Sequence, residues 1–179
     1  MNEQAESVGL IMVDDNVPAA EAMRRWCGDN GTLRWLGSAE EGEAAAALVA
    51  RHRPAVVLLD VEMPGTDTFA LLPRLATESP ETAVVMFSGH CQPDVIGRAL
   101  AAGAAGYILK DEPMASIGAM LRRAGDGEFV MSAAAAAAYV RAAENGEDRT
   151  TGAAQAATVA VVISDHGPSS PRVLIQPAK

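Results

Sequence analysis

Short runs of apolar residues alternate along the chain with longer stretches in which apolar side chains recur every three or four positions. The short runs predict buried strands over residues 8–13, 33–37, 56–60, 83–87 and 107–109. The longer stretches predict a helix after each strand. Strands and helices that alternate through short connections are typical of the α/β class with a doubly wound parallel sheet. We therefore expect a five-stranded parallel sheet with helices on both faces.

Capping residues predict where three of the helices begin. Asn16 is suited to cap the first helix, and Ser38 and Glu41 have the spacing of a capping box for the second. Asp67 is suited to cap the third helix, but Pro73 falls in the interior of that helix and removes a backbone hydrogen bond. We expect a kink or a late start there.

Polar side chains stand at the ends of the predicted strands. Because the carboxyl ends of parallel strands meet at one edge, where open α/β sheets bind ligands, these side chains should lie together. The residues are Asp14, Asp15, Asp60, Ser88 and Lys110. Taken alone, Asp60 has a simpler interpretation as a cap of the next turn, but capping explains five such positions poorly.

The chemistry of these residues predicts a phosphorylation site. Three crowded carboxylates repel one another unless a cation neutralises them, and oxygen ligands suit Mg²⁺. The Lys110 ammonium is suited to hold a second anion, such as a phosphoryl group, and Ser88 can donate a hydrogen bond to it. A carboxylate nucleophile with a metal, a lysine and a hydroxyl forms a site for making an aspartyl phosphate.

Composition narrows the classes of partner. The 179 residues are 49% apolar and carry a net charge of −9, which disfavours a phosphate backbone as a direct partner. Residues 1–6 lack the features of a secretory signal, and no apolar run approaches the roughly 20 residues of a spanning helix, so we expect a cytoplasmic protein without a membrane partner. Cys27 and Cys91 show no zinc-site spacing, and both are expected to be buried.

Residues 8–123 resemble the response-regulator receiver domain of bacterial two-component signalling. The resemblance rests on five features in order: Asp14-Asp15 after the first strand, Asp60 with Met63-Pro64-Gly65, Ser88, Tyr107 and Lys110. It implies a chemotaxis-regulator-like, flavodoxin-like sheet of order 2-1-3-4-5. It also implies that Asp60 accepts a phosphoryl group from a histidine kinase or phosphotransfer protein. Enzymatic activity beyond self-phosphorylation from phosphodonors and autodephosphorylation is not expected.

The resemblance also assigns the other site residues. Asp15, Asp60 and the backbone carbonyl of Glu62 would bind Mg²⁺ directly, and Asp14 would bind it through water. Lys110 and Ser88 would hold the phosphoryl oxygens. Ser88 would also act with Tyr107 as the switch, and a downstream protein would read the surface of the fourth helix, fifth strand and fifth helix. A homodimer is a further expectation.

Two positions depart from the family pattern, and the details of the chain favour one subgroup. Thr68 stands where the family usually has glycine, and Asp111 stands where many members have a cis-proline. Residues 103–110 and 129–132 look most like regulators of the LuxR type, in which a receiver precedes a helix-turn-helix DNA-binding domain.

The rest of the chain predicts a receiver over residues 1–125 and an extension over residues 126–146. Ser132 is suited to cap an alanine-rich helix in that extension. Residues 147–157 have the composition of a linker, and residues 158–179 form a short tail with a possible β-hairpin or no fixed structure. Only three basic residues follow position 145, and no recognition helix is apparent, so a DNA-binding output is not expected.

Three alternatives remain open at this point. One is a Mg²⁺-dependent phosphohydrolase that uses Asp60 as a transient nucleophile, because Glu62 stands two residues beyond it, where such enzymes place an acid/base. Another is a LuxR-type transcriptional regulator with an eroded output domain. The third, least favoured by the five intact positions, is a receiver that has lost phosphorylation.

Overall fold

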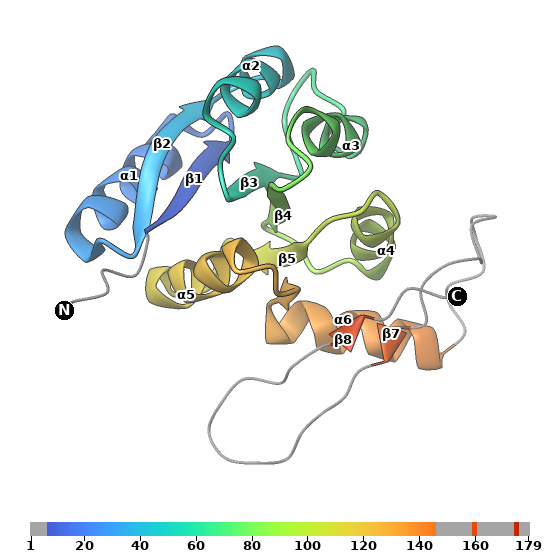
Figure 1. Ribbon diagram of the computed structural model, residues 1–179. Helices are drawn as coiled ribbons and strands as arrows, with labels where there is room; N and C mark the ends of the chain where they lie inside the picture. Colours follow the sequence, from blue (N-terminus) through green and yellow to red (C-terminus); the bar gives the residue numbers. More distant parts are fainter. Residues whose placement is uncertain (1–6, 146–158, 161–173, 176–179) are drawn as a thin grey trace.

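The computed structural model describes residues 7–145, 159–160 and 174–175. Its main sheet has six parallel strands in the order β2-β1-β3-β4-β5-β6 (Figure 1). In chain order the strands are β1 (Val8–Val13), β2 (Leu33–Ala39), β3 (Val56–Asp60), β4 (Ala83–Ser88), β5 (Gly106–Leu109) and β6 (Val130–Met131). The helices are α1 (Val17–Asn30), α2 (Gly42–His52), α3 (Thr68–Glu78), α4 (Pro93–Ala101), α5 (Met114–Gly125) and α6 (Ala133–Glu144).

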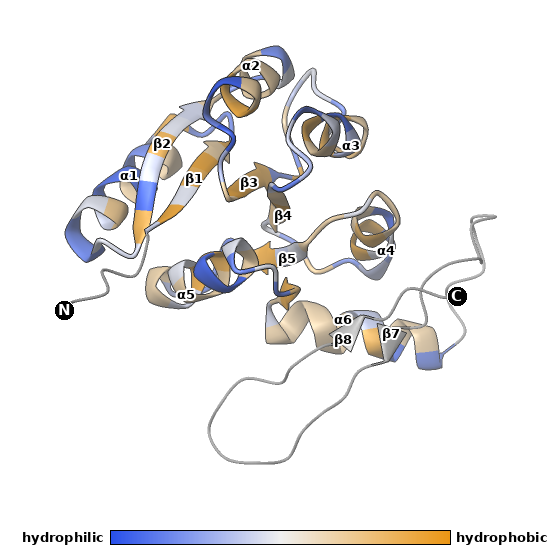
Figure 2. Ribbon diagram, in the orientation of Figure 1, coloured by the Kyte–Doolittle hydropathy of each residue, from blue (hydrophilic) through white to orange (hydrophobic). Residues whose placement is uncertain are grey.

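Alternate residues of the central strands supply two hydrophobic cores, one on each face of the sheet. Leu10 and Leu58 pack under α1 and α5, whereas Ile11 and Leu59 pack under α2, α3, α4 and α6. All residues of β1 and β3 are buried, as helices on both faces require. Figure 2 shows β3 in hydrophobic colours and hydrophilic stretches along α1. The predicted doubly wound sheet and its first five strands in the order 2-1-3-4-5 are confirmed.

The sixth strand was not predicted. β6 pairs with β5 in parallel through Gly106↔Val130 and Tyr107↔Met131. A strand of two residues is too short to show a periodic pattern, so only the open edge of β5 identifies it. A separate pair, β7 (Val159–Ala160) and β8 (Leu174–Ile175), is antiparallel. The possible hairpin over residues 158–179 stays a prediction, because the connection between these strands lies outside the described residues.

The hydrogen bonds at the first turns of α1, α2 and α3 show which of the predicted caps form. The Asn16 side chain accepts a hydrogen bond from the amide of Ala19, and Asp67 accepts from the amides that open α3, so both predicted caps are confirmed. The capping box at Ser38 is wrong, because Ser38 lies in β2 and Glu41 precedes α2 without a side-chain cap. α3 begins at Thr68, so there is no late start, and Pro73 lies inside it.

The structure also bears on the expected burial of the two cysteines and on the possibility of a membrane-spanning helix. Cys27 is buried as predicted, but Cys91 is exposed in the connection between β4 and α4, so that part of the prediction is wrong. Among the helices that the structure describes, none is long and apolar enough to cross a membrane.

Candidate functional site

The parallel sheet brings the predicted strand-end residues to one edge. Asp14 follows β1, Asp60 ends β3, Ser88 ends β4 and Lys110 follows β5. Asp14, Asp60 and Ser88 are buried, with exposed fractions of 1%, 3% and 1%, whereas Asp15 is exposed. The edge therefore combines side chains held inside the protein with one carboxylate that faces solvent.

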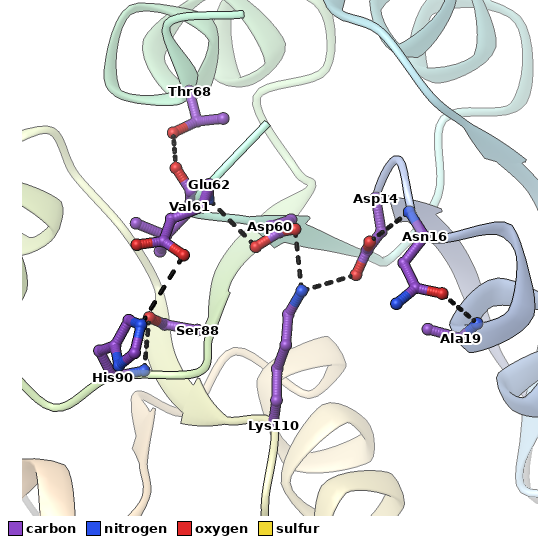
Figure 3. Close-up of polar contacts among 10 residues, drawn as sticks. All are labelled: Asp14, Asn16, Ala19, Asp60, Val61, Glu62, Thr68, Ser88, His90 and Lys110. Carbon is purple, nitrogen blue, oxygen red and sulfur yellow. Dashed lines mark hydrogen bonds and ion pairs between the residues drawn. The ribbon is translucent and has the colours of Figure 1, made fainter. Parts of the chain in front are cut away.

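Lys110 links two of these carboxylates. Its Nζ lies 2.8 Å from Oδ2 of Asp60 and 3.1 Å from Oδ2 of Asp14 (Figure 3). The other oxygens are held by backbone: Oδ1 of Asp60 accepts from the amide of Glu62 at 3.1 Å, and Oδ1 of Asp14 accepts from the amide of Asn16 at 2.8 Å. Each carboxylate is thus fixed from two sides, which holds the site in one geometry.

Charge at the site is only partly balanced. Burial raises the pKa of Asp60 above its ordinary value, and the neighbouring Asp14 adds to this, although Lys110 and the amide of Glu62 act in the opposite direction. Burial by itself would lower the pKa of Lys110, but its hydrogen bonds to Asp60 and Asp14 raise it. The lysine therefore stays charged, while the carboxylate cluster favours a further cation.

The acidic residues fit a divalent metal ion. Asp14, Asp15 and Asp60 each offer an oxygen, and these oxygens lie within 4.8 Å of one another. One lysine against three carboxylates leaves an excess of negative charge, and an all-oxygen set suits Mg²⁺. The predicted ligand role of the Glu62 carbonyl stays a prediction.

Ser88 and Tyr107 meet in the connection between β4 and α4. The Oγ of Ser88 accepts a hydrogen bond from the amide of His90 at 3.1 Å, and the hydroxyl of Tyr107 donates to the carbonyl of His90 at 2.9 Å. Tyr107 is fully buried, and burial raises the pKa of its hydroxyl. Both predicted switch residues thus hold the same loop residue, His90.

Sequence reasoning missed two residues beside the site. The imidazole of His90 lies 3.9 Å from the carboxylate of Glu62, and both side chains are exposed beside Asp60 (Figure 3). Thr68 is buried, and its hydroxyl donates to the carbonyl of Val61 at 2.8 Å, which fixes the loop that follows Asp60. Two sequence features could have pointed to them: Thr68 stands where the family usually has glycine, and His90 follows the strand-end Ser88 by two residues.

Comparison with known proteins shows the family. The family model described as "Response regulator receiver domain" matches residues 10–122, so the chain belongs to the response-regulator receivers of two-component systems. "Probable transcriptional regulatory protein NarL" of Mycobacterium tuberculosis (strain ATCC 25618 / H37Rv) is 34% identical over 116 residues, which cover 65% of this chain and 54% of that protein. The chain therefore spans about half the length of this relative.

Two solved structures resemble the fold. The signal receiver domain of a NarL response regulator from Mycobacterium tuberculosis has a TM-score of 0.65 and 32% identity, over 69% of this chain and 99% of that one. A LuxR-family response regulator from Aurantimonas sp. SI85-9A1 has a TM-score of 0.72 over 77% of this chain and 99% of that one. At 20% identity, the second likeness shows the fold alone.

Proposed function

We propose that the chain is a phosphorylation-gated response regulator and that Asp60 accepts a phosphoryl group from a histidine kinase or a phosphotransfer protein. The observation that carries this proposal is the Lys110 ammonium, which lies 2.8 Å from the Asp60 carboxylate and also pairs with Asp14. A buried carboxylate beside a fixed cation suits nucleophilic attack on a phosphorus atom. The cation stabilises the negative charge that develops on the phosphoryl oxygens in the transition state.

In the transfer step, an Asp60 oxygen attacks the phosphorus of a phosphohistidine. A phosphorus–oxygen bond forms as the phosphorus–nitrogen bond breaks, and the departing imidazole nitrogen keeps the electron pair. Lys110 keeps its contact with Asp14 and moves its second hydrogen bond to a phosphoryl oxygen. Ser88 accepts from the amide of His90, and its hydroxyl can rotate to donate its proton to the phosphoryl group.

Asp14, Asp15 and Asp60 would hold Mg²⁺ together with the backbone carbonyl of Glu62. When bound, the ion supplies positive charge against the transferring oxygens and against the carboxylates themselves. The arrangement of three carboxylate oxygens within 4.8 Å supports this assignment.

A direct test follows phosphorylation by intact mass. The protein is incubated with a small-molecule phosphodonor and Mg²⁺, alongside Asp60→Asn and the exposed control Asp29→Asn. We expect the mass of one phosphoryl group on wild type and on Asp29→Asn, and none on Asp60→Asn. The gain should disappear when Mg²⁺ is chelated. An equal gain on Asp60→Asn would refute the assignment.

We also propose that the output is a protein contact and not DNA binding. Residues 146–179 hold only Arg149, Arg172 and Lys179 as basic residues, which gives little charge for a phosphate backbone. The NarL relative, which is named as a transcriptional regulator, favours the second candidate, a DNA-binding regulator. Salt-sensitive binding of duplex DNA by the full chain, lost on truncation after Asn145, would decide for that candidate.

The match to the receiver family favours a response regulator over the phosphohydrolase alternative. Multiple turnover of unrelated phosphate esters in the same assay would revive it. A cytoplasmic location and a homodimer remain part of the proposal. Sedimentation with and without the phosphodonor tests the homodimer.

A further inference from the structure

Helix α6 lies against α4 and β5. Ala135 of α6 is fully buried and belongs to the same core cluster as Ile96 and Ala99 of α4. The ring of Tyr139 lies over Gly97, where an added β-carbon would be 3.6 Å from Cε2 of the ring. The chain thus covers with its own helix part of the α4–β5 face, by which we mean the surface of residues 93–109 (Figure 1). This face is part of the surface predicted for a downstream partner, and that prediction stays a prediction.

Strand β6 and Ser132 attach α6 to β5. The amide of Ser132 donates to the carbonyl of Tyr107 at 3.0 Å, and the amide of Leu109 donates to the Oγ of Ser132 at 3.0 Å. Ser132 is 1% exposed, so these bonds are shielded from water. Ser132 occupies the N-cap position of α6 as predicted, but its side chain makes no cap bond to α6 and accepts from β5 instead.

The same residues of β5 lead to the phosphorylation site. Leu109 directly precedes Lys110, which holds Asp60. Tyr107 bonds Ser132 through its carbonyl and His90 through its hydroxyl. His90 in turn donates to Ser88, and the loop that carries it runs into α4 at Pro93. Hydrogen bonds therefore join the site to both elements on which α6 rests.

We propose that α6 is an intramolecular ligand of the α4–β5 face and that phosphorylation of Asp60 weakens its hold, so that the face becomes available to a partner. This proposal rests on the proposed function. The packed position of α6 occurs together with the Lys110–Asp60 ion pair. Phosphorylation replaces that pair and draws the Ser88 hydroxyl toward the phosphoryl oxygens, which pulls His90 and the start of α4 with it.

Close packing makes α6 sensitive to such a shift. A tightly packed helix pair has discrete arrangements and adapts poorly to small displacements, and glycine at position 97 leaves no side chain to adjust beneath Tyr139. Coupling between two sites is reciprocal, so a variant that loosens α6 must favour phosphorylation, by at most the factor by which phosphorylation loosens α6.

The test measures amide exchange of residues 133–144 in the full chain, with intact mass recorded on the same samples. On phosphorylation we expect exchange in α6 to rise by about 5- to 150-fold, the usual range of such coupling. Tyr139→Ala should exchange rapidly without phosphorylation and reach a higher phosphorylated fraction at limiting phosphodonor. Arg141→Ala, which truncates an exposed side chain of the same helix, should behave as wild type.

The outcomes separate the two proposals. A full phosphoryl mass gain with unchanged or slower α6 exchange overturns this inference and leaves the proposed function standing. A lower phosphorylated fraction in Tyr139→Ala also overturns it. Absence of any mass gain on wild type refutes both. Asp60→Asn treated with the phosphodonor should show no change in α6, and a change there would mean that the donor acts elsewhere.

Discussion

Replacing Lys110 by methionine tests how the site is held together. The substitution keeps an unbranched side chain, one atom shorter, and removes the charge that lies 2.8 Å from Asp60 and 3.1 Å from Asp14. The two carboxylate side chains are 4% and 0% exposed, so without the ammonium both are left buried and uncompensated. Breaking a buried pair in this way costs about 3–5 kcal/mol. The lysine side chain is 31% exposed, which places the expected loss at the lower end, about 3 kcal/mol.

Urea unfolding at pH 7 without Mg²⁺ measures this loss, with the fluorescence of Trp26 and Trp35 as the signal. Arg122→Met is the matched control, because Arg122 forms a solvent-exposed ion pair with Asp126 at 3.6 Å. Such surface pairs contribute about 0–1 kcal/mol. If Lys110→Met loses no more free energy of unfolding than Arg122→Met, the lysine does not hold the site together and the reasoning fails.

The loss should also depend on pH and on metal. Burial raises the pKa of Asp60 in the folded protein, so the stability linked to its protonation is present below the unfolded pKa of about 3.9 and is lost as pH rises through the folded pKa. Removing Lys110 takes away a group that lowers this pKa, so the lost stability should be larger at pH 7 than at pH 4. Mg²⁺ should restore part of it at pH 7, because the ion supplies the missing positive charge.

Three further predictions concern single positions. Asp15→Asn should weaken Mg²⁺ binding, measured by titration, while changing the free energy of unfolding by no more than about 0.5 kcal/mol, because Asp15 is exposed. Thr68→Val should cost about 1–3 kcal/mol in urea unfolding, because the part-buried carbonyl of Val61 loses its donor; an unchanged midpoint would contradict this. Gly106→Ala should cost about 1–3 kcal/mol and raise amide exchange at residues 130–132, because the new β-carbon overlaps the carbonyl oxygen of Val130; retained protection there would count against it.

The sequence determined the sheet and the site edge because both follow from local patterns. The apolar runs at residues 8–13 and 56–60 are the strands β1 and β3 within the same bounds. Once strands alternate with helices, parallel pairing places Asp14, Asp60 and Lys110 at one edge, although they are far apart in the chain.

Tertiary structure decided the features that depend on pairing between distant segments. Ser132 has the local sequence of a helix cap, yet the amide of Leu109 takes its hydroxyl oxygen, because β6 lies on the open edge of β5. Ser38 matches a capping box, yet β2 continues to Ala39 alongside β1. Spacing along the sequence predicts a residue's hydrogen-bond partners only when both partners belong to the same helix or turn. Between elements they are set by which backbone groups the packed sheet leaves unpaired, and that is fixed only when the whole chain is folded.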